Sequence, residues 1–294
     1  MSDDGKLSDE AILQELEVLG EIAVAHKAPG SPLATHCETI NGQQYDVFSN
    51  VPHNLGELYD LSLEQADETF LVYQQERYSF KQTHDMARRL ARVLQDNYAI
   101  TKGDRVAVCA RNSPEWCIAY MATTLLGAIV VPMNSWWQSA ELEYGLKDSG
   151  SKLVFVDEAR FQQLSTCKQA LDIAIVLIKP QINTDLPEFY SLLRNVEPLS
   201  NAEVAAQNIM PEDSASIMYT SGSTGMAKGV LSSHRNIINA LYTWKFVKEI
   251  GEIFRPELVE ENPEYQPAIL ANVPLFHVTG SHAHAATLVR HALT

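Results

Sequence analysis

The sequence predicts an α/β fold in which a predominantly parallel β-sheet is covered by helices on both faces, giving αβα layers. From residue 69 onward, short apolar segments alternate with segments of helical periodicity, which is the order expected of a βαβ chain. The apolar segments are nearly continuous instead of alternating with polar residues, as in strands buried on both faces. A helix between two strands lets both run in the same direction, so we expect a parallel sheet.

The first predicted element is an amphipathic helix over residues 8–26. Ser8 is a suitable N-cap, and the acidic Asp9 and Glu10 suit the positive end of the helix dipole. The polar face is acidic, so we expect the helix to pack on the rest of the protein and not on an anionic membrane. We assign residues 1–44 to an N-terminal extension that carries it. Its apolar stripe consists of Ile12, Leu13, Leu16, Leu19 and Ile22.

The strands and helices of the sheet follow in order from residue 69. Asn112-Ser113-Pro114-Glu115 predicts one helix start clearly, because a capping residue precedes a proline in the first turn. Residues 180–212 form a looser connection in which prolines recur. The predicted strands are 69–74, 76–80, 105–110, 128–132, 152–156 and 173–178, with helices at 81–97, 115–126, 140–148 and 159–171.

A loop over Thr220–Gly229 carries the strongest functional signal. It contains three glycines, four Ser or Thr residues and one lysine. Such a loop can surround phosphate oxygens with backbone N–H groups and hydroxyls, because glycine allows close approach and positive φ. Apolar residues flank it, so we predict a strand at 217–219, a second strand at 229–232 and a helix that begins near His234.

The spacing within this loop excludes two common phosphate-binding motifs. The pattern G-x-x-x-x-G-K-[ST] fails because Ala227 occupies the second glycine position and Lys228 is followed by Gly229. The dinucleotide fingerprint G-x-G-x-x-G fails because the loop contains no Gly-x-Gly. A flexible Ser/Gly turn fits poorly too, since a linker has no reason to end in Thr-Gly-x-x-Lys-Gly between two strands.

Thr220–Gly229 resembles the phosphate-binding signature of the adenylate-forming (AMP-binding) superfamily, [ST]-S-G-[ST]-T-G-x-P-K-G. One position departs, since Ala227 stands where proline is usual, which lowers backbone rigidity but removes no phosphate ligand. Four further segments are similar to family motifs in the family's order. The resemblance covers residues 45–294, which we assign to the first part of the AMP-binding (adenylation) domain. Of these four segments, Glu141–Gly150 resembles the acyl-CoA synthetase (fatty-acid–CoA ligase) branch in particular. The other similar segments are Tyr78–Phe80, Leu125–Asn134 and Pro274–Gly280.

The resemblance implies a two-step reaction that uses ATP, Mg²⁺ and coenzyme A. A carboxylate, from a fatty acid in this branch, attacks the α-phosphorus of ATP, and the thiol of coenzyme A then displaces AMP. A carboxylic acid is already ionised at neutral pH, so the first step needs alignment and charge stabilisation instead of a general base. The implied nucleotide-binding residues are Thr220, Ser221, Gly222, Ser223, Thr224, Gly225 and Lys228, and those with an implied catalytic role are Thr224, Lys228 and His277.

Two of these assignments have alternatives. Lys228 either steers phosphate or lies at the edge of the loop. His277 is either an ordinary buried histidine or, with Phe276 and Gly280, part of the substrate pocket that the Pro274–Gly280 motif implies. It follows the apolar run 269–273, which we predict as a strand, and precedes a helix predicted at 281–294.

Two other groups of residues could form sites, and we expect neither to do so. His282 and His284 are two residues apart on a predicted helix and therefore point to different faces, so we expect no metal site. Trp136-Trp137 could be an exposed aromatic site, but we expect packing at the start of a helix.

Composition limits the other possibilities. The formal net charge of −15 excludes a nucleic-acid-binding protein, and ATP and coenzyme A would have to bind through local donors and Mg²⁺. The four cysteines include no C-x-x-C pair; Cys109 and Cys117 lie in apolar surroundings, so we expect buried thiols in a reducing compartment. We see no signal peptide and no stretch long enough to span a bilayer, and expect a cytoplasmic protein. Oligomeric state is not indicated.

Several parts of the family's active site have no counterpart in this sequence. These are the adenine-binding motif, the ribose-binding carboxylate, and the small C-terminal domain with its lysine. We therefore expect an incomplete adenylation domain that is inactive on its own. The alternatives are a peptide-synthetase adenylation domain, an aryl-CoA ligase, a luciferase-like enzyme, or a catalytically inactive nucleotide-binding fragment.

Overall fold

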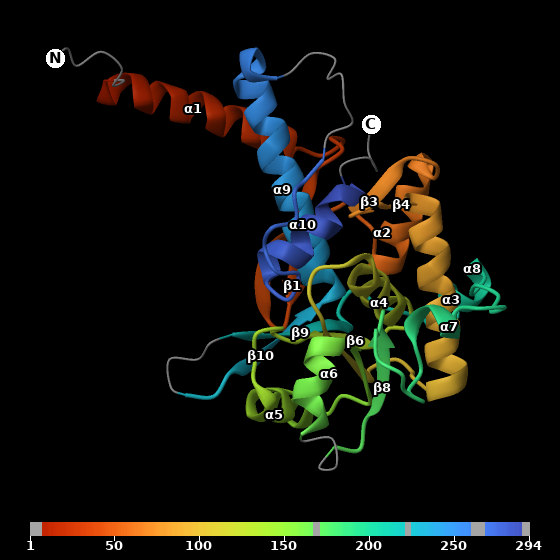
Figure 1. The fold of residues 1–294 in the computed structure, drawn as a ribbon. Helices are drawn as coiled ribbons and strands as arrows, with labels where there is room; N and C mark the ends of the chain where they lie inside the picture. The colour runs from red at the N-terminus through yellow and green to blue at the C-terminus, as the bar shows by residue number, and fades with distance from the viewer. Residues whose placement is uncertain (1–7, 167–170, 221–224, 260–267, 290–294) are drawn as a thin grey trace. The chain divides into compact units, whose positions relative to one another are not determined.

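The computed structural model describes residues 8–166, 171–220, 225–259 and 268–289 (Figure 1). The chain forms two compact units. Of the described residues, 8–51, 239–259 and 268 belong to the smaller unit, and 52–166, 171–220, 225–238 and 269–289 belong to the larger unit. Among the helices of the described residues, none combines the length and the apolarity that crossing a bilayer requires.

The larger unit is built on a six-stranded sheet with the order β10-β9-β6-β5-β7-β8. Strands β5 to β8 are parallel to their neighbours, β9 runs parallel to β6, and only β10 is antiparallel. The predicted α/β fold with a predominantly parallel sheet is therefore confirmed. The strands are β5 (Arg105–Cys109), β6 (Ile129–Pro132), β7 (Leu153–Asp157), β8 (Ala174–Ile178), β9 (Ser214–Thr220) and β10 (Lys228–Ser233).

Helices pack on this sheet as the near-continuous apolar strands require. Helix α4 (Pro114–Leu125) is buried along its whole length, because it contacts β5 and β6 and is covered by α2 (Leu55–Leu61) and α3 (Phe80–Tyr98). The predicted start of α4 is confirmed, since the Ser113 side chain accepts a hydrogen bond from the Trp116 N–H ahead of Pro114.

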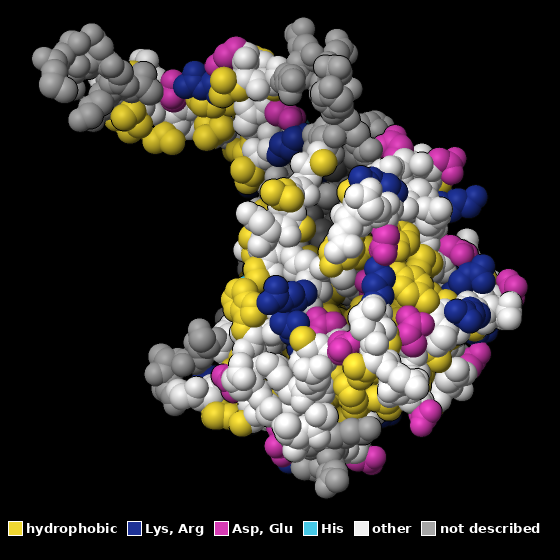
Figure 2. Space-filling model, viewed as in Figure 1, with side chains coloured by type: hydrophobic (Ala, Val, Ile, Leu, Met, Phe, Trp, Pro, Cys, Tyr) yellow, Lys and Arg dark blue, Asp and Glu magenta, His cyan; other side chains and the backbone are white. Residues whose placement is uncertain are grey.

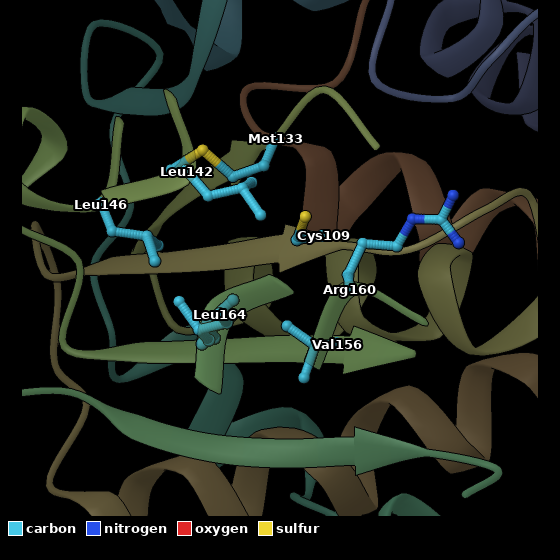
Figure 3. Close-up of a pocket in the computed structure, with 8 residues that line it drawn as sticks. Cys109, Met133, Leu142, Leu146, Val156, Arg160 and Leu164 are labelled. Carbon is cyan, nitrogen blue, oxygen red and sulfur yellow. The ribbon is translucent and has the colours of Figure 1, made fainter. Parts of the chain in front are cut away.

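A second layer consists of α5 (Ser139–Ser149) and α6 (Glu158–Ser165) (Figure 1). Leucines of both helices meet alternate residues of β5, β6, β7 and β8 in one apolar cluster. Figure 3 shows part of it, with Cys109, Met133 and Val156 on the same side of the sheet as the leucines. The space that these side chains line cannot hold a water molecule. This region is hydrophobic core and not a ligand site.

Several segments of the larger unit differ from the sequence prediction. The predicted helix 159–171 is α6, which already ends at Ser165. The connection 180–212 contains two short helices, α7 (Phe189–Leu192) and α8 (Asn201–Ala205). The predicted strand 269–273 is wrong, because residues 269–273 have no regular structure, and α10 (Val278–Val289) begins three residues before the predicted helix 281–294. The predicted hairpin is confirmed as β3 (Thr69–Tyr73) and β4 (Glu76–Ser79), with η1 (Ser62–Gln65) before it.

The smaller unit contains α1 (Asp9–His26), the hairpin of β1 (Thr35–Ile40) and β2 (Gln43–Phe48), the part of α9 (His234–Phe254) from residue 239 onward, and η3 (Pro256–Leu258). The N-cap of α1 is confirmed, since Ser8 accepts a hydrogen bond from the Ala11 N–H at 3.2 Å. The β1–β2 hairpin was not predicted, although its turn Asn41-Gly42, with φ of 50° and 80°, is a strong hairpin signal.

Candidate functional site

The glycine-rich loop lies at the tip of the antiparallel hairpin β9–β10, which confirms the predicted strand–loop–strand arrangement. Thr220 and Lys228 form the last pair of the ladder before the loop, and the Thr220 hydroxyl lies 3.5 Å from the Lys228 carbonyl oxygen. Four predicted phosphate-binding residues lie outside the described residues. These are Ser221, Gly222, Ser223 and Thr224.

The described part of the loop is accessible to a ligand. Thr220, Gly225 and Lys228 are exposed. Gly225 has a φ of +117°, which glycine adopts without strain, and apart from its chain neighbours no described residue comes within 4 Å of the position of a Cβ there. In the described part of the chain no carboxylate pairs with the Lys228 ammonium, so its charge is available to an anion.

Two tyrosine hydroxyls anchor the loop end of this hairpin to α5. Tyr144 donates a hydrogen bond to the Ala227 carbonyl at 3.0 Å. Tyr219 lies within hydrogen-bond distance of both the Gly145 carbonyl, at 3.1 Å, and the Asp148 carboxylate, at 2.7 Å. Burial, together with this carboxylate, raises the pKa of Tyr219, so the hydroxyl remains a donor. The sequence placed Tyr144 and Asp148 in a motif but gave them no function.

The second predicted part of the site, Pro274–Gly280, is held by one distant side chain. The Asn112 amide donates to the carbonyls of Ala271 and Val273, at 3.0 and 2.9 Å, and its oxygen accepts from the Leu275 N–H at 2.9 Å. These three hydrogen bonds explain why residues 269–273 form no strand, since their backbone groups bond to a side chain instead of a neighbouring strand. Asn112 was predicted only as part of a helix start.

Within this segment, the three predicted pocket residues have different environments. Phe276 is buried, whereas His277 is exposed and its ring centroid lies 4.6 Å from that of Phe276. His277 is therefore not the buried histidine of the alternative interpretation. Gly280 allows a close approach of backbones, because a Cβ there would lie 2.2 Å from the Pro274 carbonyl oxygen.

The tryptophan pair lies between the two parts of the site. Trp136 meets the Phe276 ring edge-on at a centroid distance of 5.4 Å, and Trp137 meets the Tyr219 ring edge-on, also at 5.4 Å. Packing is therefore confirmed for Trp137, which lies against the apolar cluster of the sheet, whereas Trp136 contacts Phe276 but is 60% exposed, so the prediction is wrong for Trp136. Adjacent residues thus contact both the phosphate-loop hairpin and the Pro274–Gly280 segment.

The sheet topology explains why these segments meet. β5, β6 and β9 run parallel, so their carboxyl ends lie at the same edge of the sheet. Asn112 follows β5, the tryptophan pair follows β6, and the glycine-rich loop follows β9. Ligands of open α/β sheets bind at this edge.

Three buried titratable side chains of the larger unit have a shifted pKa. Burial raises the pKa of the Cys109 thiol to about 12 and raises that of Cys117 as well, so the predicted buried thiols are confirmed. Burial lowers the pKa of His282. Among the residues with described side chains, no three potential ligands gather into a metal site; the His284 side chain and His291 lie outside them.

Comparisons with known proteins identify the family of the chain. Residues 62–293 match the family described as AMP-binding enzyme. Long-chain-fatty-acid–CoA ligase FadD13 of Mycobacterium tuberculosis is 30% identical over 202 residues, which cover 69% of this chain and 36% of that protein. 4-Coumarate–CoA ligase 3 of Arabidopsis thaliana is 29% identical over 201 residues, covering 68% of this chain and 33% of that protein.

A solved structure shares the fold. The inhibitor-bound crystal structure of the N-terminal domain of FACL13 from Mycobacterium tuberculosis superposes with a TM-score of 0.63 at 26% identity, over 82% of this chain and 56% of that domain. The chain thus spans about a third of the length of the curated relatives described above.

Proposed function

The chain belongs to the AMP-binding enzyme family, and we propose that it forms the pyrophosphate side and the acyl side of the site of an ATP-dependent fatty-acid–CoA ligase. The observation that carries the proposal is the meeting of two segments at one edge of the sheet. There Trp137 packs against Tyr219, just before the glycine-rich loop, and its neighbour Trp136 packs against Phe276 of the Pro274–Gly280 segment.

On the nucleotide side, the loop would bind the β- and γ-phosphates of ATP. The open space at Gly225 lets phosphate oxygens approach the backbone, and Lys228 supplies a positive charge that no described carboxylate neutralises. Ser221, Gly222, Ser223 and Thr224 would complete this cradle, with Thr224 and Lys228 stabilising the charge that develops as pyrophosphate departs. Mg²⁺ would bridge the phosphate oxygens of the bound ATP, as this ion does in most nucleotide sites.

On the acyl side, Phe276, His277 and Gly280 would separate the carboxylic acid from the nucleotide. Phe276 presents an apolar ring supported by Trp136, which suits the hydrocarbon of a fatty acid. His277 is exposed beside it and would stand next to the reacting carboxylate. The likeness to FadD13, whose name states long-chain fatty acids, supports this substrate class.

An aryl acid is the second candidate substrate. The chain is nearly as similar to 4-coumarate–CoA ligase 3, and the aromatic pair Trp136 and Phe276 would also stack on a planar acid. Transfer of the acyl group to coenzyme A, and activity as a whole, would also require the parts of the relatives that this chain does not span.

Pyrophosphate binding tests the nucleotide side on this chain directly. We expect calorimetry with Mg²⁺-pyrophosphate to show binding that Gly225→Val and Lys228→Ala each weaken by about tenfold or more, equivalent to about 1.4 kcal/mol. Met226→Ala is the matched control, because Met226 lies exposed in the same loop. Equal affinity in all four proteins would refute the role of the loop.

Isotope exchange between ATP and pyrophosphate tests the acid. The assay is run with fatty acids of several lengths and with hydroxycinnamic acids, using the 294-residue chain and a fusion of it to the remaining part of FadD13. In the active protein we expect fatty acids to support the fastest exchange and Thr224→Ala to slow it by about tenfold or more. Faster exchange with the aryl acids would favour the second candidate.

A further inference from the structure

A cluster of charged and aromatic side chains surrounds Lys179, the residue that follows β8. Its ammonium lies 2.7 Å from a carboxylate oxygen of Glu76 on β4 and 2.9 Å from one of Glu115 in the first turn of α4. Figure 2 shows basic and acidic side chains next to hydrophobic ones on the surface of the larger unit. One lysine thus connects three elements that are far apart in the sequence, and none of the three residues belongs to the candidate site.

The carboxylate of Glu115 is fully buried, so its stability depends on its partners. The hydroxyl of Tyr190 on α7 donates to Oε1, the same oxygen that Lys179 contacts. The other oxygen, Oε2, has no hydrogen-bond partner among the residues that the structure describes. A buried carboxylate is costly unless its charge is compensated. Glu115 therefore relies on the ammonium of Lys179 to remain in its buried position.

The neighbours of Lys179 keep it charged and in place. Its ammonium lies 5.5 Å from the ring centroid of Tyr73 and 5.7 Å from that of Tyr190, within the range of cation–π attraction. Burial opposes the charge, but the carboxylates of Glu76 and Glu115 outweigh it and raise the pKa of Lys179. The backbone φ of Lys179 is +45°, a left-handed conformation that persists only where the surroundings impose it.

The buried carboxylate lies close in sequence to Asn112, the side chain that holds the backbone of residues 271–275. Asn112 precedes the N-cap of α4, and Glu115 is the second residue of that helix. On the other side of Asn112, the Arg111 N–H donates to the carboxylate of Asp157 at the end of β7, at 3.0 Å. The backbone of Asn112 is thus held on both sides by carboxylates, one accepting from a backbone N–H and one paired with a lysine.

We propose that Lys179 and Glu115 are positioning residues for the acyl side of the site. The pair fixes the first turn of α4 and so the place from which the Asn112 amide reaches Val273 and Leu275. That backbone leads directly into Phe276 and His277. The consequence for acid binding rests on the proposed function, whereas the link from Lys179 to the segment Pro274–Gly280 does not.

The phosphate side of the site is held by other contacts. The hairpin β9–β10 is anchored to α5 by the hydroxyls of Tyr144 and Tyr219. In the described part of the chain, the bonds of Lys179 and Glu115 reach β4, α4 and α7 but not this hairpin. Loss of the Lys179 charge should therefore affect one of the two segments of the site and not the other.

Hydrogen exchange of the 294-residue chain, followed by mass spectrometry, tests this difference. Lys179→Met leaves the carboxylate of Glu115 buried without its counter-charge, so we expect exchange in residues 274–280 to become faster by about tenfold or more and exchange in 214–220 to stay unchanged. Lys179→Arg keeps the charge and should stay within about threefold of the wild type. Lys248→Met is the matched control, because Lys248 is paired with Glu252 on the surface of α9 and should change neither region.

A double variant separates positioning by the charge pair from a general loss of stability. Lys179→Met with Glu115→Gln removes both charges and keeps an acceptor for Tyr190, so exchange in 274–280 should return to within about threefold of the wild type. If Lys179→Met does not fold by circular dichroism, Lys179→Gln serves as the milder variant. Faster exchange in the double variant than in the single one, or equal acceleration in 214–220, overturns the proposal.

The fusion to the remaining part of FadD13 tests the consequence for the acid. Lys179→Met should raise the KM for the fatty acid by about threefold or more and leave the KM for ATP unchanged, because only the acyl side loses its position. An equal rise in both KM values overturns the assignment to the acyl side. If the wild-type fusion shows no activity with any acid, the proposed function fails, and hydrogen exchange of the chain alone still decides the role of Lys179.

Discussion

The hairpin β9–β10 and the segment Pro274–Gly280 meet at one edge of the sheet but are positioned by different means. The hairpin belongs to the sheet, and its backbone ladder is reinforced by the hydroxyls of Tyr144 and Tyr219. The other segment follows irregular backbone whose carbonyls and N–H groups bond to Asn112 alone among the described side chains. We therefore expect the hairpin to tolerate loss of one contact, and the segment Pro274–Gly280 to depend on single residues.

The largest expected effect comes from a substitution within the segment Pro274–Gly280. In Gly280→Ala, the new Cβ would lie 2.2 Å from the Pro274 carbonyl oxygen, so the backbone itself must move. We expect a loss of about 3 kcal/mol of unfolding free energy, measured by urea denaturation. Gly251→Ala is the control, since nothing lies within 4 Å of a Cβ there and alanine favours its helix. Equal stability of the two variants would contradict the close approach at Gly280.

We expect acid to lower the unfolding free energy through a buried histidine next to the hairpin β9–β10. His234 follows β10, is fully buried and accepts a hydrogen bond from the Leu55 N–H at 3.1 Å. Burial lowers its pKa from 6.5 to about 4. Because the unfolded state binds the proton more tightly, this stabilisation is complete above about pH 6.5 and is lost as the pH falls towards 4, by about 3 kcal/mol.

The measurement is urea denaturation at several pH values in this window for the wild type and His234→Gln. We expect the stability of the variant to fall less steeply with acid, because glutamine has no proton to bind. Carboxylates with lowered pKa lose their contribution only below their normal pKa, which is 3.8 for Asp213 and 4.5 for Glu76, and they are present in both proteins, so they affect the comparison little. Parallel pH profiles of the two proteins would show that His234 does not titrate in this way.

Asn112→Ala should release the second segment and leave the hairpin in place. The change removes three hydrogen bonds and leaves the partly buried Leu275 N–H without its acceptor, which we expect to cost about 2 kcal/mol. Hydrogen exchange followed by mass spectrometry should show faster exchange in residues 274–280 and unchanged exchange in 214–220. Asn272→Ala, an exposed neighbour, is the control. Equally faster hydrogen exchange in both regions would mean that Asn112 also stabilises the hairpin.

The smallest expected effect concerns the tyrosine anchors. Tyr144→Phe and Tyr219→Phe each remove a hydroxyl but keep the ring, and we expect a loss of about 1 kcal/mol each. Pyrophosphate affinity should fall a few-fold in each and further in the double variant, while exchange in residues 274–280 stays at the wild-type rate. If either single substitution abolishes pyrophosphate binding, the hairpin depends on a single hydrogen bond, and the expected difference from the segment Pro274–Gly280 is wrong.

Local signals were sufficient to predict most of the larger unit. Nearly continuous apolar runs located the strands and period-3.6 patterns located the helices, because the buried faces of these elements must be apolar wherever they pack. Ser113-Pro114 predicted the start of α4, and the glycine-rich loop predicted the hairpin around it, since both depend on neighbouring residues only. The same approach missed β1–β2, whose strands are mostly exposed and lack an apolar pattern, although Asn41-Gly42 indicated the turn.

The sequence by itself therefore determined the fold class, the family resemblance and the two segments of the candidate site. Only the tertiary structure decided how these segments are held: the run 269–273 is apolar enough for a strand, but Asn112, more than 150 residues earlier, takes its backbone hydrogen bonds. Likewise, Trp136-Trp137 joins two segments that are distant in sequence. Such contacts depend on which strands become neighbours in the sheet, and hydrophobic periodicity carries no information about strand order.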